Sequence, residues 1–352
     1  MRSGNVLLAA LVVAITASGA AGSSVSRVMQ KARENRNLRI AWMGTSITCG
    51  LGASSESQQF PVQVNKLVER QTGAKLVSRN FCFGGAQSLL QVVLLKTAVL
   101  PWKPDLVVAE LGTLDELYGS ISLPSIEAFL RIAYDAGIPV IAIYPYTNYA
   151  DVARSGLHKL GALYGDDVID MVTYASKRGA ALNMISSDGC HPNDKGQALI
   201  VDAFEERMKA GAPGENRTNS QPKRMYAPDL SGVDLQPISL DAGAERVGPR
   251  LFDGRGYALR ISAERLITQT FRGSFIGLLF QYNGTPIKIS YRIDDGGWSD
   301  VQIAPEWFLN YVLRTDLKDA NHTIQLRIVA KQGRPAVLEG LFVDAGIRAG
   351  IN

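Results

Sequence analysis

The chain has 352 residues, of which 46% are apolar, and a formal net charge of +4. This composition is typical of globular proteins and the length is comfortable for two domains, which excludes disordered and fibrous classes for most of the chain. The charge is small for this length, and no run of Lys and Arg is interleaved with aromatic residues, so the sequence indicates no nucleic-acid partner.

Residues 1–22 are typical of a secretory signal peptide. Arg2 precedes an apolar run from Val6 to Ile15, and small residues follow at 17–22. The apolar run is shorter than the ~20 residues that a membrane-spanning helix needs, which favours cleavage over an uncleaved anchor. We therefore expect a secreted or periplasmic protein that has no membrane span after signal cleavage.

Strand and helix patterns alternate from residue 38 to residue 209, after an amphipathic segment at 25–36. The predicted strands are 38–43, 76–80, 106–111, 138–144 and 181–185, and the predicted helices are 61–71, 88–100, 124–136, 171–178 and 196–209. Such alternation predicts a parallel sheet with helices on both faces. We place this α/β domain at residues 36–210.

The pattern changes after the α/β domain. Residues 211–230 begin with a stretch rich in Gly, Pro, Asn and Ser, which predicts a linker. Short alternating strands follow at 258–261, 275–280, 287–293 and 323–328, and turn signals at 283–284 and 294–297 separate them. Residues 231–350 therefore predict a smaller all-β sandwich domain.

Two segments of the α/β domain carry candidate chemistry. Ser46 directly follows the first predicted strand, at the sheet edge where α/β proteins bind ligands. Asp188 and His191 lie late in the domain, spaced so that one turn can present both. A serine hydroxyl needs a base to take its proton, and the base needs a carboxylate to fix its tautomer. Taken singly, Ser46 is more often a helix cap and Asp188 a turn cap, but their joint occurrence favours a catalytic triad.

The same segments resemble the blocks of the SGNH hydrolases, also called GDSL esterases/lipases, in chain order. Residues 44–47, Gly-Thr-Ser-Ile, look like the Gly-Asp-Ser-Leu block, and residues 188–193 match the Asp-x-x-His-Pro block. Residues 80–85 are similar to the second block, and residues 110–115 resemble the third. The resemblance covers roughly residues 39–208 and implies a flavodoxin-like three-layer parallel sheet and ester hydrolysis.

The resemblance also assigns roles to residues of this chain. It implies that Ser46 is the nucleophile, His191 the base and Asp188 the residue that orients the base. The amides of Ser46 and Gly85 would form the oxyanion hole, and no metal or cofactor is implied. The family's third block usually ends Gly-x-Asn-Asp, and its Asn donates to the oxyanion, whereas this chain has Leu114.

This departure leaves three states open: an active enzyme with a modified oxyanion hole, a slow enzyme, and an inactive protein that keeps the fold for binding. The loss of one donor typically costs ~10²–10³ in turnover. A milder departure is Thr45, which stands where the family usually has Asp. Because an inactive protein has no physical reason to keep Ser46, Asp188 and His191 together, activity is favoured.

Two further features remain open from the sequence. The three cysteines, Cys49, Cys82 and Cys190, can form at most one disulfide; Cys49–Cys190 would brace the site, and two unpaired buried thiols are the alternative. The β domain could bind carbohydrate through aromatic platforms, although aromatic residues at strand spacing more often belong to a core. The candidate platforms are Tyr282, Tyr291, Trp298, Trp307 and Tyr311.

The sequence therefore predicts an exported serine esterase that hydrolyses an acyl ester, O-acetyl above all, on a carbohydrate. One alternative is a polysaccharide O-acyltransferase that uses the same triad, because the two activities differ only in which acceptor reaches the acyl-enzyme. The other alternative is a catalytically inactive glycan-binding protein.

Overall fold

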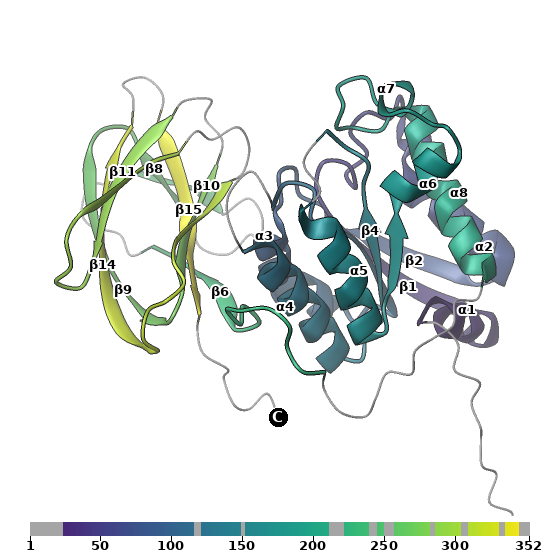
Figure 1. Cartoon of the computed structure of the whole chain (residues 1–352), viewed down its shortest axis with the longest axis horizontal. Coiled ribbons are helices and arrows are strands. Elements are labelled where there is room, and N and C mark those ends of the chain that lie inside the picture. Colours follow the sequence, from purple (N-terminus) through teal and green to yellow (C-terminus); the bar gives the residue numbers. More distant parts are fainter. Residues whose placement is uncertain are drawn as a thin grey trace, which may run out of the picture.

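Figure 1 shows the computed structural model, in which a helix-covered sheet lies beside a β-sandwich. The structure describes residues 24–115, 121–148, 152–210, 222–238, 245–249, 257–281, 286–303, 309–330 and 335–344. The predicted signal peptide (1–22) lies outside the described residues, as do residues 211–221 of the predicted linker.

The first domain is built on five parallel strands in the order β2-β1-β3-β4-β5. The strands are β1 (Asn37–Met43), β2 (Lys75–Asn80), β3 (Leu106–Glu110), β4 (Val140–Tyr144) and β5 (Asp167–Asp170). This is the flavodoxin-like strand order, in which ligands bind at the carboxyl ends of the strands beside the point where the order reverses. Here that point lies between β1 and β3.

Helices cover both faces of the sheet. One face carries α1 (Ser24–Asn35), α2 (Phe60–Thr72), α6 (Met171–Lys177) and α8 (Asp194–Ala210), and the other carries α3 (Ser88–Leu94), α4 (Ser122–Asp135) and α5 (Val152–Tyr164). Alternation along β1 sends Ile40 and Trp42 to the first face and Ala41 and Met43 to the second. The predicted three-layer α/β fold is confirmed.

In the α/β domain, one predicted strand is a helix, and a strand and a helix were not predicted. Residues 181–185 were expected as a strand, but they contain the short helix α7 (Leu182–Ile185). A short apolar run carries no periodicity that distinguishes the two structures. β5 and α5 were not predicted; β5 has four residues, of which Asp167 and Asp170 belong to a type depleted in strands.

The second domain is the predicted all-β sandwich. One sheet has the order β13-β10-β15-β8-β7, with β6 also paired to β15, and the other has the order β12-β11-β14-β9. The strands are β6 (Val233–Gln236), β7 (Glu245–Pro249), β8 (Tyr257–Ile261), β9 (Arg265–Gly273), β10 (Ile276–Gln281), β11 (Ile287–Ile293), β12 (Ser299–Ile303), β13 (Leu309–Arg314), β14 (Ala320–Val329) and β15 (Ala336–Asp344). Apolar side chains from both sheets form one core between them.

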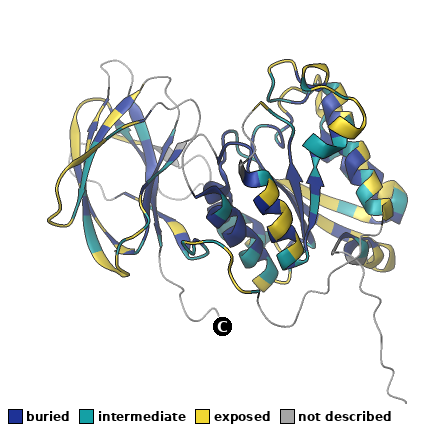
Figure 2. Cartoon of the chain, in the orientation of Figure 1, coloured by how far each residue is buried: buried dark blue, intermediate teal, exposed yellow. Residues whose placement is uncertain are grey.

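The two domains share a continuous apolar contact. All seven residues of α3 are buried (Figure 2), and the apolar cluster around α3 and α4 extends to Leu235, Leu279 and Phe342 of the β domain. Polar contacts reinforce this packing. The Lys96 ammonium donates to the carbonyl oxygens of Ser231 and Val233, where burial lowers its pKa although nearby carboxylates oppose the shift.

A buried carboxylate fixes the chain where it leaves the linker. Glu127 of α4 is 2% exposed and accepts hydrogen bonds from the amides of Met225 and Tyr226, each at 2.7 Å. The Tyr164 hydroxyl donates to the same carboxylate at 3.0 Å. This contact therefore docks the end of the predicted linker on α4.

Candidate active site

The turn that carries Ser46 follows directly from strand β1. Gly44 lies at the first position of this turn, where an added Cβ would lie 2.7 Å from Oε2 of Glu110 and 2.1 Å from Oγ1 of Thr48. Only glycine lets the backbone pass this close to Glu110. Ser46 is thereby placed just beyond the carboxyl end of β1.

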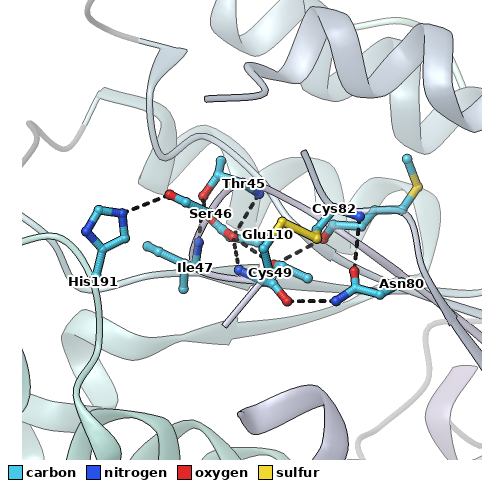
Figure 3. Close-up of a disulfide and its surroundings, with 10 residues drawn as sticks. Thr45, Ser46, Ile47, Cys49, Asn80, Cys82, Glu110 and His191 are labelled. Atoms are coloured by element: carbon cyan, nitrogen blue, oxygen red, sulfur yellow. Dashed lines mark hydrogen bonds between the residues drawn. A yellow bond between two sulfur atoms is a disulfide. The ribbon is translucent and has the colours of Figure 1, made fainter. Parts of the chain in front are cut away.

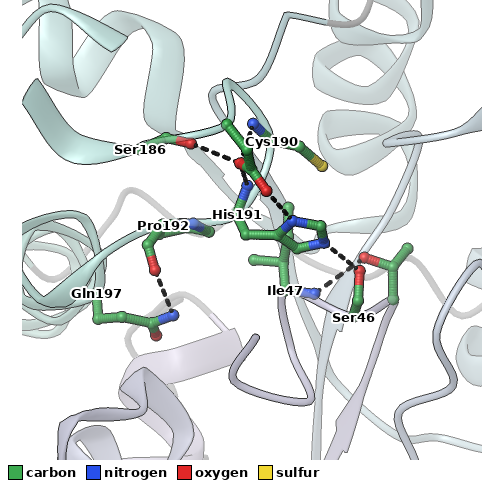
Figure 4. A network of polar contacts seen from close by, with 9 residues as sticks. Ser46, Ile47, Ser186, Cys190, His191, Pro192 and Gln197 are labelled. Carbon is green, nitrogen blue, oxygen red and sulfur yellow. Dashed lines mark hydrogen bonds and ion pairs between the residues drawn. The ribbon is translucent and has the colours of Figure 1, made fainter. Parts of the chain in front are cut away.

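The structure brings Ser46, His191 and Asp188 into one chain of contacts. Figures 3 and 4 show the contact between Ser46 and His191. The Ser46 hydroxyl lies 2.8 Å from His191 Nε2, and His191 Nδ1 lies 2.6 Å from Asp188 Oδ2. Each ring nitrogen of His191 thus faces a different partner. This is the geometry that activates a serine nucleophile.

Asp188 is held by hydrogen bonds rather than by burial, since its side chain is 52% exposed. Its Oδ1 accepts from the amides of Cys190 and His191 at 2.9 and 2.7 Å, and from the Ser186 hydroxyl at 3.1 Å. Burial alone would raise the pKa of Asp188, but the hydrogen bonds from His191, Cys190 and Ser186 outweigh it and hold the pKa well below the usual range. The carboxylate is therefore ionised and fixed in orientation at neutral pH.

Two neighbouring loops hold the segment that carries His191. The Asn148 amide, beyond β4, donates to the Gly189 carbonyl at 2.8 Å. On the other side, Ser54 donates to Asp194 through its amide at 2.8 Å and its hydroxyl at 2.6 Å. Ser54 lies shortly after the Ser46 turn, so this contact ties the loop that carries His191 to the loop that carries Ser46.

The predicted oxyanion loop lies against the Ser46 turn. The Phe83 amide donates to the Gly44 carbonyl at 2.9 Å, two residues before Gly85. Gly85 itself has φ +80°, a value that favours glycine. In the described part of the chain, neither the Ser46 amide nor the Gly85 amide donates a hydrogen bond, so both are available to a substrate oxygen.

The disulfide joins Cys49 to Cys82, with a Cα–Cα distance of 5.4 Å. The pairing Cys49–Cys190 that the sequence left open is therefore wrong, and Cys190 forms no disulfide within the described ranges. Cys82 follows β2, which pairs directly with β1, so the ends of these strands bring it beside Cys49. The bridge links the Ser46 turn to the loop that leads to Gly85 (Figure 3).

Residues 110–115, the third block, contain Leu114 where the family pattern has Asn. Leu114 is 8% exposed and presents an apolar side chain in place of the Asn donor. The following residue, Asp115, accepts from the Ser88 amide at 2.7 Å and the Ser122 hydroxyl at 3.1 Å, so it braces α3 and α4. The amides of Ser46 and Gly85 remain as the two candidate oxyanion donors.

Sequence reasoning assigned no role to Glu110, which is 1% exposed at the end of β3. Its carboxylate accepts hydrogen bonds from Thr45 and Thr48 of the Ser46 turn and from Thr113 of the third block. The only signal in the sequence is an acidic residue that ends an apolar strand, which suggests a buried carboxylate without naming its partners.

The other two histidines have structural partners. His158 Nε2 lies 3.1 Å from Asp170, the N-cap of α6. Both ring nitrogens of His322 are engaged, Nδ1 with Asp294 at 2.7 Å and Nε2 with the Lys318 carbonyl at 2.8 Å. His191 therefore differs from both, because one of its nitrogens faces a serine hydroxyl.

Among the described residues, no group of three or more His, Cys, Asp or Glu side chains is arranged to hold a metal ion. None of their helices is long and apolar enough to cross a membrane.

Comparisons with known proteins bear on the family and on the fold of the two domains. Residues 42–199 match the GDSL-like Lipase/Acylhydrolase family. The matched segment lies within the α/β domain. The predicted class of enzyme, a carboxylic ester hydrolase of the SGNH/GDSL type, is confirmed at the level of the family. A search of the curated proteins finds no significant match to the chain.

The two-domain arrangement also has solved counterparts. The chain is similar to a two-domain esterase active on acetylated mannans, with a TM-score of 0.73 and 18% identity over 91% of this chain and 95% of that one. The same description applies to a crystal with mannopentaose, which matches with a TM-score of 0.73 and 17% identity over 91% and 94% of the two chains. At this identity the likeness establishes a shared fold, and it extends from the GDSL-type domain through the β-sandwich.

Proposed function

We propose that this protein is an exported serine esterase that removes an acyl group, in the first place O-acetyl, from a carbohydrate. The observation that carries the proposal is the aligned contact from Ser46 Oγ through His191 to Asp188, at 2.8 and 2.6 Å. These distances lie within hydrogen-bond reach, as a nucleophile, its base and an orienting carboxylate require.

The reaction follows from the contacts of the three side chains. Ser46 Oγ attacks the ester carbonyl while His191 Nε2 takes its proton, and Asp188 stabilises the imidazolium. The tetrahedral intermediate collapses as the bond between the acyl carbon and the sugar oxygen breaks; His191 gives its proton to that oxygen, which leaves as a hydroxyl, and the acyl group stays on Ser46. A water molecule then attacks the acyl-enzyme, with His191 again as the base, and releases the carboxylic acid.

The developing oxyanion would be bound by the amides of Ser46 and Gly85. Both belong to segments that the Cys49–Cys82 disulfide holds together. Preorganised donors need no reorganisation during the reaction, which is the usual source of oxyanion stabilisation. Leu114 supplies no third donor, so we expect a lower turnover than a hole with an additional Asn would give.

Carbohydrate as the carrier of the ester is supported by the likeness to an esterase active on acetylated mannans over both domains. In the β domain, Trp298 is 40% exposed, and the guanidinium groups of Arg292 and Arg327 lie 5.3 and 5.0 Å from its ring centre. Tyr291 and Tyr311 pack against the sandwich core, and Tyr282 and Trp307 lie outside the described residues. Trp298 is therefore the described aromatic residue best placed to contact a sugar.

Export is supported by the predicted signal peptide and by the disulfide. Disulfides persist in oxidising compartments and are rare in the cytosol. The Cys49–Cys82 bridge lies beside the proposed nucleophile, so a secreted or periplasmic location agrees with the chemistry of the site.

The decisive experiment is hydrolysis of p-nitrophenyl acetate by the mature protein, together with mass spectrometry after treatment with a phosphonate ester. We expect turnover and a single adduct on Ser46, both lost in Ser46→Ala. Ser176→Ala, an exposed serine on α6, is the matched control and should behave as wild type. If wild type shows neither turnover nor an adduct, the esterase proposal is wrong and the binding-protein alternative replaces it.

The natural substrate class is tested with acetylated mannan and acetylated xylan, by measuring released acetate. Added oligosaccharide acceptors distinguish hydrolysis from transfer, because an acyltransferase would give an acylated acceptor in place of free acetate. We expect acetate as the main product. Acylated acceptor as the main product would instead establish the transferase alternative.

A further inference from the structure

We propose that Glu110 is a positioning residue for the nucleophile, which holds the Ser46 turn in its reactive geometry from beneath. The inference rests on the proposed esterase function. Glu110 has no contact with Ser46 itself in the described structure, so its action is through the backbone of the turn.

Five hydrogen bonds from three threonines converge on the Glu110 carboxylate. Oε2 accepts from the amides of Thr45 and Thr48 at 3.0 and 3.1 Å and from the Thr48 hydroxyl at 2.7 Å. Oε1 accepts from the hydroxyls of Thr45 and Thr113 at 2.6 and 2.5 Å. Two of the five donors are backbone amides, which cannot accept, so the oxygen that faces them must be an acceptor, as a carboxylate oxygen is.

The donors flank the nucleophile on both sides. Thr45 immediately precedes Ser46 and lies beside Glu110 in Figure 3. Thr48 follows Ser46 by two residues, so one carboxylate fixes the two ends of the segment between them. The side chain of Thr45 continues the network, because its Oγ1 accepts from the Ile47 amide at 3.3 Å. The position of Ser46 and the direction of its amide are therefore coupled to Glu110.

This network gives a physical role to a departure from the family pattern. The usual Asp before the nucleophile would place a second carboxylate against Glu110, whereas Thr45 donates a hydroxyl to it. Thr113, next to Leu114, donates to the same carboxylate. The turn and the third block are thus joined through Glu110.

Glu110→Gln tests the proposal with little change in shape. The two amides of Thr45 and Thr48 require an oxygen, so the Gln NH₂ group must face the hydroxyls of Thr45 and Thr113, which then have to rotate and accept. We expect kcat to fall about tenfold or more with KM within about twofold, because small displacements of a nucleophile cost rate rather than binding. Hydrogen exchange of residues 44–49 should also become faster.

Glu127→Gln is the matched control, since Glu127 is equally buried and also accepts two backbone amides, but on α4. It should lose stability while keeping kcat within about twofold of wild type. Thr48→Val is a second variant, to be used if Glu110→Gln folds poorly. It removes one hydroxyl donor and keeps Glu110, and we expect it to lower kcat severalfold at constant KM.

The outcomes separate this proposal from the esterase proposal. If wild type is active but Glu110→Gln and Thr48→Val keep kcat and exchange at the level of Glu127→Gln, the positioning role is overturned. If wild type is neither active nor labelled at Ser46, the esterase proposal fails. The exchange rates of the turn then still decide whether Glu110 holds it.

Discussion

Gly52 offers a sharp test of how closely His191, the proposed base, must be held in position. It has φ +93°, and an added Cβ would lie 2.6 Å from the Pro192 carbonyl oxygen and 3.0 Å from His191 Cβ. Ordinary contacts begin at 3.4 Å, so the two backbones in Gly52→Ala must separate by about 0.8 Å (3.4 minus 2.6). The displaced atoms belong to His191 and its neighbour, so the 2.8 Å contact with Ser46 should be lost.

A misplacement of about 1 Å can cost roughly 10² in rate, which corresponds to about 2.7 kcal/mol of activation free energy. We expect this fall in kcat for p-nitrophenyl acetate. Gly137→Ala is the control: its φ is +70°, but nothing lies within 4 Å of the added Cβ. Both variants carry backbone strain of about 1–2 kcal/mol, and only Gly52→Ala disturbs the site. If both variants keep the same kcat, the loop does not position His191 and the reasoning is refuted.

Three further predictions address other parts of the molecule. In Asp188→Asn, the position of Oδ1 must still be an oxygen because it accepts hydrogen bonds from two backbone amides. The Asn NH₂ group then faces His191 Nδ1 and enforces the wrong tautomer of the ring. The value of kcat at pH 7 should fall ~10⁴-fold, and a loss under tenfold would contradict this. Replacing Cys49 and Cys82 by Ala removes a cross-link between residues separated by 33 positions. The free energy of unfolding, measured in urea, should fall by about 4 kcal/mol, and an unchanged midpoint would exclude the bridge. The hydrogen bond to the Lys318 carbonyl, and to a smaller extent the one to the Asp294 carboxylate, raises the pKa of His322 above its ordinary value of 6.5. The stability that the protonated ring contributes is fully present below pH 6.5 and is lost as the pH rises through the pKa of the folded protein. His322→Gln should therefore cost more stability at pH 5.5 than at pH 9, and equal costs would count against the ion pair.

Most of the sheet, and the place of Ser46 at its edge, could be predicted because their signals are local. Buried strands appear as apolar runs, and parallel strands place the segments that follow them at one edge of the sheet. β5 could not be predicted in the same way, because a four-residue edge strand with two aspartates lacks such a run. Its place is fixed by pairing with β4, which is a tertiary contact.

The disulfide and the contacts of Glu110 depended on strand order, which the sequence does not specify. Cys82 meets Cys49 because β2 pairs with β1, and Glu110 meets Thr45 because β3 pairs with the other edge of β1. Sequence proximity to the triad suggested Cys190 instead. The partner of a side chain at a strand end is thus set by the neighbouring strand rather than by distance along the chain.

These contacts bear on whether Leu114 marks an inactive protein. A protein that only bound glycan would need neither a fixed serine turn nor an oriented imidazole. Here the Ser46 turn is held by Glu110 and by the Cys49–Cys82 bridge, and Gly52 packs against the segment that carries His191. Because preorganisation of the reacting groups and of the oxyanion amides supplies most of the catalysis in such sites, the loss of one donor at Leu114 should slow the reaction without abolishing it.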